Sequence, residues 1–141
     1  WLEWMTDTGE GKSRLVDMNM LTLKHYFHPI MKGRTSIKKV VDAIWITNPA
    51  LRQRFPAYVK EANKEILSPY HSLPPLLIDG EDVFVAEGTG AIRAYQAMLY
   101  GNEKSNPGVR EQWKKLLLQY CQLDTLAMVM VYLHWREQVS A

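Results

Sequence analysis

The stretch LLLQYCQLDTLAMVMVYLHW, residues 116–135, decides how the rest of the chain has to fold. It holds no proline or glycine and is apolar almost throughout, which predicts a helix that other parts of the protein enclose. No helix breaker occurs from residue 109 to 138, so we expect one long helix there. An aspartate, Asp124, stands in the middle of the apolar run, and a buried carboxylate needs a partner.

Tyr120 precedes Asp124 by four residues, and this spacing places the two side chains on the same face of a helix. The spacing alone leaves three interpretations of Asp124 open. The carboxylate accepts hydrogen bonds from backbone amides at a kink between two helices, with Tyr120 in the core, or it pairs with a distant arginine such as Arg93 or Arg136. In the third interpretation Asp124 binds a metal ion, and the phenol of Tyr120 lies beside it.

Length and composition are those of an ordinary soluble domain. The chain has 141 residues, of which 47% are hydrophobic and 23% charged, enough to build one core. Its formal net charge of +2 is too small to predict nucleic-acid binding from bulk electrostatics. The single cysteine, Cys121, excludes an internal disulfide and a cysteine-based zinc site, and it favours a cytoplasmic location.

A membrane span is not expected from the sequence. No signal peptide opens it, and Gln119, Gln122, Asp124 and His134 interrupt the apolar run, which lipid tolerates poorly. The sequence begins at Trp1 rather than at a methionine, and WLEW resembles the interior of a domain. We therefore expect the chain to be a piece of a longer protein.

Three further helices are expected where apolar residues recur at helical spacing, over residues 18–27, 37–45 and 90–100. His28-Pro29 stops the first of them, because the residue before a proline avoids the helical region. Ser36 or Thr35 supplies the N-cap of the second, and Gly101 supplies the C-cap of the third.

Shorter elements are predicted in the rest of the chain. RLVDM, residues 14–18, is partly β-branched and bounded by turn residues, which predicts a buried strand that ends at Asp17. Prolines break up the region from 46 to 90, where ALRQRF (50–55) and AYVKEANKEI (57–66) indicate helical turns and DVFVA (82–86) a short edge strand. The glycine-bearing TDTGEGKS, residues 6–13, predicts a loop.

Basic residues gather around the start of the second predicted helix, at Lys32, Arg34, Lys38 and Lys39, with Ser36 among them. A helix N-terminus with adjacent cations can contact nucleic-acid phosphates, and we expect such a contact here. A solvated surface explains the same pattern and stays open as the alternative. His25 and His28 stand at a spacing that metals use, but without a third ligand nearby we interpret them as surface residues.

The run YCQLDTLAMV resembles the third exonuclease motif, a tyrosine and an aspartate four apart, of the DEDD-type 3′-to-5′ exonucleases in the ribonuclease H-like superfamily. VDMNMLTLKHYFHPIMKGRTSIKKVVDAI resembles the segment of these proteins in which a strand ends in Asp and a Ser-capped helix follows a basic turn. With AEGTGAIRAY between them, the two stretches look closest to a bacterial family of uncharacterised, predicted nucleases. The resemblance covers residues 14–137, weakly across 46–85.

The resemblance implies an α/β domain of the ribonuclease H-like fold, of which this chain is the C-terminal part, predominantly helical with one or two short strands. It also implies a nuclease whose acidic residues hold two Mg²⁺ or Mn²⁺ ions and which cleaves DNA or RNA from its ends. In that scheme Asp124 is a metal ligand, and Tyr120 orients the attacking water. Asp17 matches a structural aspartate of the family.

The sequence departs from the family's pattern at its start, because no Asp and Glu pair on a hydrophobic strand precedes residue 14, where WLEW offers only Glu3. We therefore expect residues 1–141 to be a single domain or the C-terminal half of one, inactive as an isolated piece, with nucleic acid as the partner of the parent protein. The second hypothesis is a non-catalytic helical module that binds a protein or nucleic acid, or self-associates through exposed apolar surface.

Overall fold

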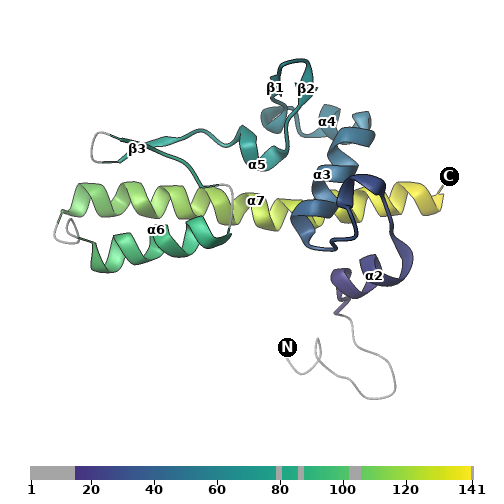
Figure 1. Cartoon of the computed structure of the whole chain (residues 1–141), viewed down its shortest axis with the longest axis horizontal. Coiled ribbons are helices and arrows are strands. Elements are labelled where there is room, and N and C mark those ends of the chain that lie inside the picture. The colour runs from purple at the N-terminus through teal and green to yellow at the C-terminus, as the bar shows by residue number, and fades with distance from the viewer. Residues whose placement is uncertain (1–14, 79–80, 86–87, 102–105, 141) are drawn as a thin grey trace.

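The structure is a computed structural model that describes residues 15–78, 81–85, 88–101 and 106–140. Within these residues the chain is mostly helical, with two small antiparallel sheets of two strands each (Figure 1). The predominance of helix expected from the sequence is therefore confirmed. The predicted loop at residues 6–13 lies outside the described residues.

The long helix α7, Pro107–Ser140, forms the axis of the molecule (Figure 1). Asn106 caps its start, because its Oδ1 accepts a hydrogen bond of 3.0 Å from the amide of Gly108. The preceding helix α6, Gly88–Tyr100, lies alongside the first half of α7 and runs in the opposite direction. It ends at Gly101, where any side chain would clash with the backbone of the last helical turn.

The helix α3, Ile37–Thr47, packs on α7 and supplies the centre of the core. Val41 and Trp45 of α3 are completely buried, as are Leu123 and Ala127 of α7. Burying a side chain such as that of valine or leucine contributes about 1.5–3 kcal/mol to folding. Packing of α3 on α7 therefore contributes strongly to the stability of the fold.

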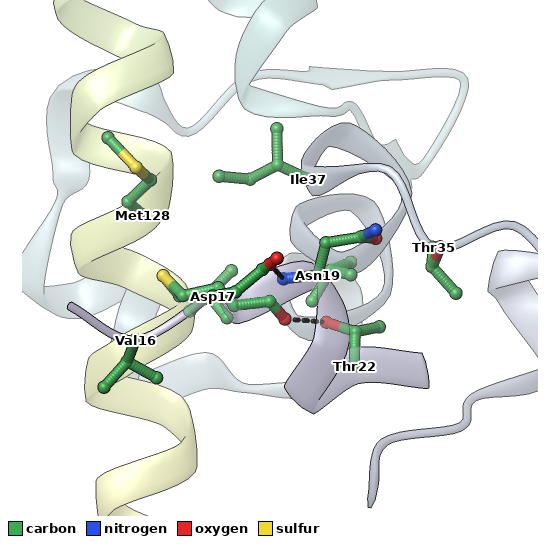
Figure 2. A pocket seen from close by; sticks show the side chains of 10 residues that line it. Val16, Asp17, Asn19, Thr22, Thr35, Ile37 and Met128 are labelled. Atoms are coloured by element: carbon green, nitrogen blue, oxygen red, sulfur yellow. Dashed lines mark hydrogen bonds between the residues drawn. The ribbon is translucent and has the colours of Figure 1, made fainter. Parts of the chain in front are cut away.

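The prediction of a strand at residues 14–18 is wrong for residues 15–18, which the structure describes. Residues 15–17 are not a strand, and Met18 begins the helix α2, Met18–His25. Asp17 is the N-cap of this helix, because its carboxylate accepts a hydrogen bond of 2.9 Å from the amide of Asn19 (Figure 2). It accepts another, of 3.1 Å, from the amide of Met20. Capping by the side chain satisfies amides at the helix start, so the sequence turns into a helix one residue after the aspartate.

The segment between α3 and α6 consists of short elements: α4 (Pro49–Arg54), η3 (Pro56–Tyr58), β1 (Glu61–Ala62), β2 (Glu65–Ile66), α5 (Pro69–Ser72), β3 (Leu76–Ile78) and β4 (Glu81–Val83). The helical turn predicted at 50–55 is confirmed by α4, and the strand predicted in DVFVA is confirmed only at Asp82 and Val83, where β4 ends. The helical turn predicted over 57–66 is wrong for most of its length. Asn63 and Lys64 adopt positive φ angles of 52° and 66°, which turn β1 back onto β2 as a hairpin.

The exposure of α7 differs from the full enclosure that its sequence predicts. Over Pro107–Val139 it is long and apolar enough to span a membrane, and 39% of its most apolar stretch is buried inside the protein. Met128 and Val129 are exposed on this helix, as is Tyr132 one turn after Met128. The described residues therefore enclose α7 only in part.

A pocket of about 360 Å³ lies where α2, α3 and α7 meet (Figure 2). Val16, Ile37 and Met128 give it apolar walls. The Thr22 hydroxyl in its wall donates a hydrogen bond of 2.8 Å to the carbonyl of Met18 within α2. The polar groups of Thr22 and Asp17 are thus engaged with the backbone of their own helix, so this pocket offers mainly apolar surface.

Candidate functional site

Asp124 finds its partner on a helix that is distant in the sequence. The hydroxyl of Tyr70, in α5, donates a hydrogen bond of 2.7 Å to Oδ1 of the half-buried Asp124. The helix α7 continues past Asp124, and the hydrogen bond of this carboxylate is with a side chain rather than with the backbone amides that the first interpretation predicts. The partner of Asp124 in this hydrogen bond is a phenol. The second interpretation predicted a guanidinium instead, that of Arg93 or Arg136.

Lys38 joins Tyr70 and Tyr120 into one cluster. Its ammonium lies 4.6 Å from the ring centre of Tyr70 and 4.7 Å from that of Tyr120. The two rings are tilted by 50°, with 6.2 Å between their centres. A cation over aromatic faces is attracted to them, by about 0.5–2 kcal/mol depending on its desolvation. Lys38, Tyr70, Tyr120 and Asp124, from the helices α3, α5 and α7, together form what we call the Asp124 cluster.

The environment of Tyr70 keeps its hydroxyl protonated. Burial raises the pKa of Tyr70 well above its usual value, and the hydrogen bond to Asp124 and the negative charge of that carboxylate raise it further. The phenol therefore stays a hydrogen-bond donor throughout the physiological pH range. This fixes the direction of the Tyr70–Asp124 bond, with the tyrosine donating and the carboxylate accepting.

An open pocket of about 400 Å³ adjoins the cluster, with Lys38 and Tyr70 in its wall. The starts of α3 and α6 contribute Ser36 and Thr89 to the lining. Ser36 occupies the predicted N-cap position of α3, but its side chain makes no capping hydrogen bond. We call this cavity the helix-start pocket, because it combines polar side chains with the first turns of two helices.

Lys39 also lines the helix-start pocket, but its charge is offset locally. Its ammonium forms an ion pair of 3.0 Å with Oδ2 of Asp42, one turn along α3. The two lysines in the lining outnumber the single aspartate, so the wall has a formal charge of +1 when His71 is neutral. A pocket of this kind favours an anionic ligand of modest size.

The residues that the structure describes do not fit a magnesium or manganese centre on their own. They contain no group of three or more His, Cys, Asp or Glu side chains that could hold a metal ion. Asp124 is one carboxylate, and its Oδ1 already accepts a hydrogen bond from Tyr70. Mg²⁺ and Mn²⁺ prefer several oxygen ligands, which a single carboxylate beside a lysine does not provide.

The predicted site residues divide into two groups. Tyr120 and Asp124 meet Lys38 in the Asp124 cluster, and Ser36, Lys38 and Lys39 line the adjoining pocket. Lys32 and Arg34 are exposed on the turn before α3 and are not among the residues that line this pocket.

The predicted histidines have structural positions rather than a shared site. His25 is exposed at the end of α2. Nδ1 of His28 accepts a hydrogen bond of 3.2 Å from the amide of Ile30 and so caps the short helix η2, Pro29–Met31.

Tyr70 is the member of the cluster that the sequence did not indicate. It lies 54 residues before Asp124, in a proline-rich region without periodicity. No motif or spacing joins the two residues, and only the packing of α5 on α7 brings them together. A buried carboxylate predicts that some donor is present, but it does not predict which one.

A second polar cluster lies near the C-terminal end of α7. The side-chain amide of Asn48 lies 3.1 Å from Nδ1 of His134 and donates a hydrogen bond of 3.1 Å to Oε2 of Glu137. Its Oδ1 accepts hydrogen bonds from the amides of Ala50 and Leu51 and so caps α4. Each polar atom of Asn48 thus serves packing between α4 and α7, and we interpret this cluster as structural.

Comparison of the chain with protein-family models, with curated protein sequences and with solved structures finds no match in any of the three. Evidence for a function therefore comes from the Asp124 cluster, from the helix-start pocket and from the resemblance of the sequence motifs to those of the exonucleases.

Proposed function

We propose that this chain contributes Tyr120 and Asp124 to a 3′-to-5′ exonuclease-like site of the ribonuclease H-like type, which hydrolyses phosphodiester bonds at DNA or RNA ends. The observation that supports the proposal is the placement of these two residues on one face of α7, with Lys38 over the ring of Tyr120 and Tyr70 bonded to Asp124. Lys38 and Tyr70 in turn line the helix-start pocket. A carboxylate that only capped a helix or paired with an arginine would not need a lysine and two tyrosines beside it.

The side chains of this chain have distinct tasks in the proposed site. The ammonium of Lys38, held over the rings of Tyr70 and Tyr120, attracts the phosphate of a nucleic-acid strand. Tyr70 donates its hydrogen bond to Asp124 and so fixes the orientation of the carboxylate. The phenol of Tyr120 then positions a water molecule beside the phosphate, as the resemblance implies.

Mg²⁺ or Mn²⁺ belongs to the proposal only if further carboxylates join Asp124. The described residues do not provide them, so the proposed site is completed by polypeptide outside these residues and the described part alone is inactive. We also propose that the protein is cytoplasmic and is not embedded in a membrane. Packing of α3, α5 and α6 covers part of α7, which leaves less of its surface for lipid.

A second candidate function is a non-catalytic module that binds nucleic acid or a protein. It is favoured by one observation, that the described residues contain no acidic cluster next to Asp124. In this case the hydrogen bond from Tyr70 to Asp124 serves to hold α5 on α7, and the helix-start pocket binds a phosphate without cleaving it.

A cleavage assay distinguishes the two functions. The protein that contains this chain is incubated with a labelled single-stranded oligonucleotide and MnCl₂, and release of terminal nucleotides is followed with time. We expect progressive shortening by the unaltered protein and a loss of at least about 100-fold in rate for Asp124→Asn, since the amide lacks the negative charge. The matched control is Glu111→Gln, which changes the charge of α7 by the same amount at a remote, exposed position.

The melting temperature of each variant is measured alongside the rate. The side-chain amide introduced by Asp124→Asn keeps an oxygen that can accept the Tyr70 hydrogen bond, so we expect the melting temperature to change little. Undiminished cleavage by Asp124→Asn would contradict the exonuclease proposal. Binding of the oligonucleotide without any shortening would favour the non-catalytic module.

A further inference from the structure

We propose that Asn48 and His134 form a pH-sensitive joint, which holds the start of α4 against α7 while the imidazole is neutral and loosens when the imidazole is protonated. Asn48 links the end of α3 to the start of α4, and both helices lie toward the C-terminal end of α7 (Figure 1). His134 follows Asp124 at a distance of about 15 Å along the helix. The joint is therefore separate from the Asp124 cluster and does not depend on the proposed function.

The orientation of the Asn48 amide decides which role the imidazole has. Oδ1 of Asn48 accepts hydrogen bonds of 2.9 and 3.3 Å from the amides of Ala50 and Leu51, so it faces the start of α4. Its Nδ2, which can only donate, lies 3.1 Å from Nδ1 of His134 and 3.1 Å from Oε2 of Glu137. Nδ1 of His134 must therefore accept, and the proton of the neutral imidazole is on Nε2.

Protonation of His134 removes this hydrogen bond, since a proton on Nδ1 would point at the N–H groups of Asn48. Rotation of the amide by half a turn would bring its oxygen to the ring. It would also turn the N–H groups toward the amides of Ala50 and Leu51 and so destroy the cap of α4. A charged imidazole therefore costs the joint a hydrogen bond in either orientation of Asn48.

The groups that act on the proton affinity of His134 favour its neutral form on balance. Burial lowers the pKa of His134, Glu137 raises it, and His28 lowers it. The carboxylate of Glu137 already accepts a hydrogen bond from Asn48. His28 uses its own Nδ1 in the same way as His134, as the acceptor of a 3.2 Å hydrogen bond from the amide of Ile30.

The elements around the joint add no negative charge to stabilise a protonated His134. Within their bounds α2, η2 and α4 contain no acidic residue, and the one in α3, Asp42, is paired with Lys39 at 3.0 Å. Tyr26, which follows α2, packs edge-on against His134, and burial raises its pKa, so its phenol stays neutral. The basic residues of α2 and α4 are Lys24, His25, Arg52 and Arg54.

Aromatic packing connects the joint to α2. Tyr26 contacts both His134 and Trp135, with 5.9 Å between the ring centres in each pair. Tyr26 and Trp135 also line a pocket of about 280 Å³ between α2 and α7. A charge on His134 disturbs this packing because the ion has to be solvated, so we expect acid to loosen the contact of α2 together with that of α4.

Nitrogen NMR of the uniformly ¹⁵N-labelled chain tests the assigned hydrogen bond directly. At pH 7.5 we expect His134 to carry its proton on Nε2 and none on Nδ1. On acidification the ring should take up its second proton with a midpoint below 6.5, and the side-chain amide of Asn48 should shift with the same midpoint. A proton on Nδ1 at pH 7.5 would overturn the proposal.

The substitution Asn48→Asp replaces the donor that faces His134 by an acceptor. Its carboxylate keeps the cap of α4, since aspartate caps helices as well as asparagine does. We expect the midpoint of His134 to rise by about 1–2 pH units, from below 6.5 to above it. A native pKa above the unfolded value gives stability that is present at low pH and lost as the pH rises. Acidification from pH 7.5 to 5.5 should therefore stabilise this variant against urea relative to its control.

The matched control is Asn106→Asp, the same substitution at the cap of the opposite end of α7. It should leave the midpoint of His134 where it is in the unaltered chain. Equal midpoints for Asn48→Asp and Asn106→Asp would overturn the proposal. The position of the proton in the unaltered chain decides the matter on its own if Asn48→Asp does not fold.

Discussion

At the scale of single residues, the hydrogen bond between Tyr70 and Asp124 explains how a carboxylate is accommodated in an apolar helix. A half-buried carboxylate without a donor is costly, and the phenol supplies that donor at 2.7 Å. The sequence identified Asp124 as the residue in need of a partner. It could not identify the partner, because Tyr70 reaches it only through tertiary packing across 54 residues.

The first prediction concerns this bond. Tyr70→Phe removes the hydroxyl and keeps the ring against Lys38, so the carboxylate of Asp124 loses its hydrogen bond but little packing changes. We expect the free energy of unfolding, measured by urea denaturation, to fall by about 1–3 kcal/mol. Tyr100→Phe is the matched control, since its side chain is 77% exposed and should change stability by less than about 0.5 kcal/mol. Equal effects of the two substitutions would show that the Tyr70–Asp124 bond contributes nothing.

The second prediction concerns His134, which is 7% exposed. Burial lowers its pKa below 6.5, and His28 lowers it further, while Glu137 acts in the opposite direction. The unfolded chain therefore binds the proton more readily than the native protein. Stability from this residue is fully present above about pH 6.5 and is lost as the pH falls through 6.5 towards the lower native pKa.

Urea denaturation at pH 7.5 and at pH 5.5 measures this dependence. We expect the unaltered chain to lose more stability on acidification than His134→Gln, which has no group to protonate at this position. His25→Gln, at an exposed position, should keep the dependence of the unaltered chain. Identical pH profiles for His134→Gln and the unaltered chain would contradict the prediction.

At the scale of elements, the four helices of eight or more residues that the structure describes could be predicted from the sequence, and most of the shorter elements could not. The expected helices at 18–27, 37–45, 90–100 and 109–138 correspond to α2, α3, α6 and α7 within a few residues at each end. The failures occurred where one side chain decides the conformation. Asp17 starts a helix where β-branched neighbours indicated a strand, and Asn63 forms a turn inside the stretch 57–66, where helical turns were predicted.

The third prediction concerns the joint between α4 and α7. Asn48→Ala removes the cap of α4 together with the contacts to His134 and Glu137. Asn106→Ala removes a cap alone, at the start of α7. We expect losses in unfolding free energy of about 2–3 kcal/mol for the first and about 1 kcal/mol for the second. A loss for Asn48→Ala no larger than that for Asn106→Ala would mean that the contacts to α7 contribute nothing.

At the scale of the whole molecule, apolar side chains remain exposed along α2 and α7. Phe27, just after α2, is 76% exposed, and Tyr132 of α7 is 56% exposed. A groove of about 480 Å³ lined by Met18, Leu21 and Trp135 lies between these helices. Exposed apolar surface of this extent is typical of a face that another polypeptide covers, and it is consistent with the expected self-association.

The fourth prediction follows from that surface. We expect the isolated chain to associate with itself as its concentration rises, as measured by sedimentation velocity. Phe27→Ser should weaken this association without lowering the melting temperature, because the ring makes little contact within the chain. Leu118→Ser, at an exposed position nearer the start of α7, serves as the control. A single monomeric species at all concentrations would contradict the prediction.

If Asp124 and its neighbours act on a nucleic-acid end, the rate of terminal-nucleotide release by the protein that contains this chain depends on the carboxylate of Asp124. The measurement compares the unaltered protein with Asp124→Asn in the presence of manganese, at a temperature where both are folded. We expect release by the unaltered protein and a rate at least about 100-fold lower for Asp124→Asn, with melting temperatures that agree. Equal rates for the two proteins would contradict it.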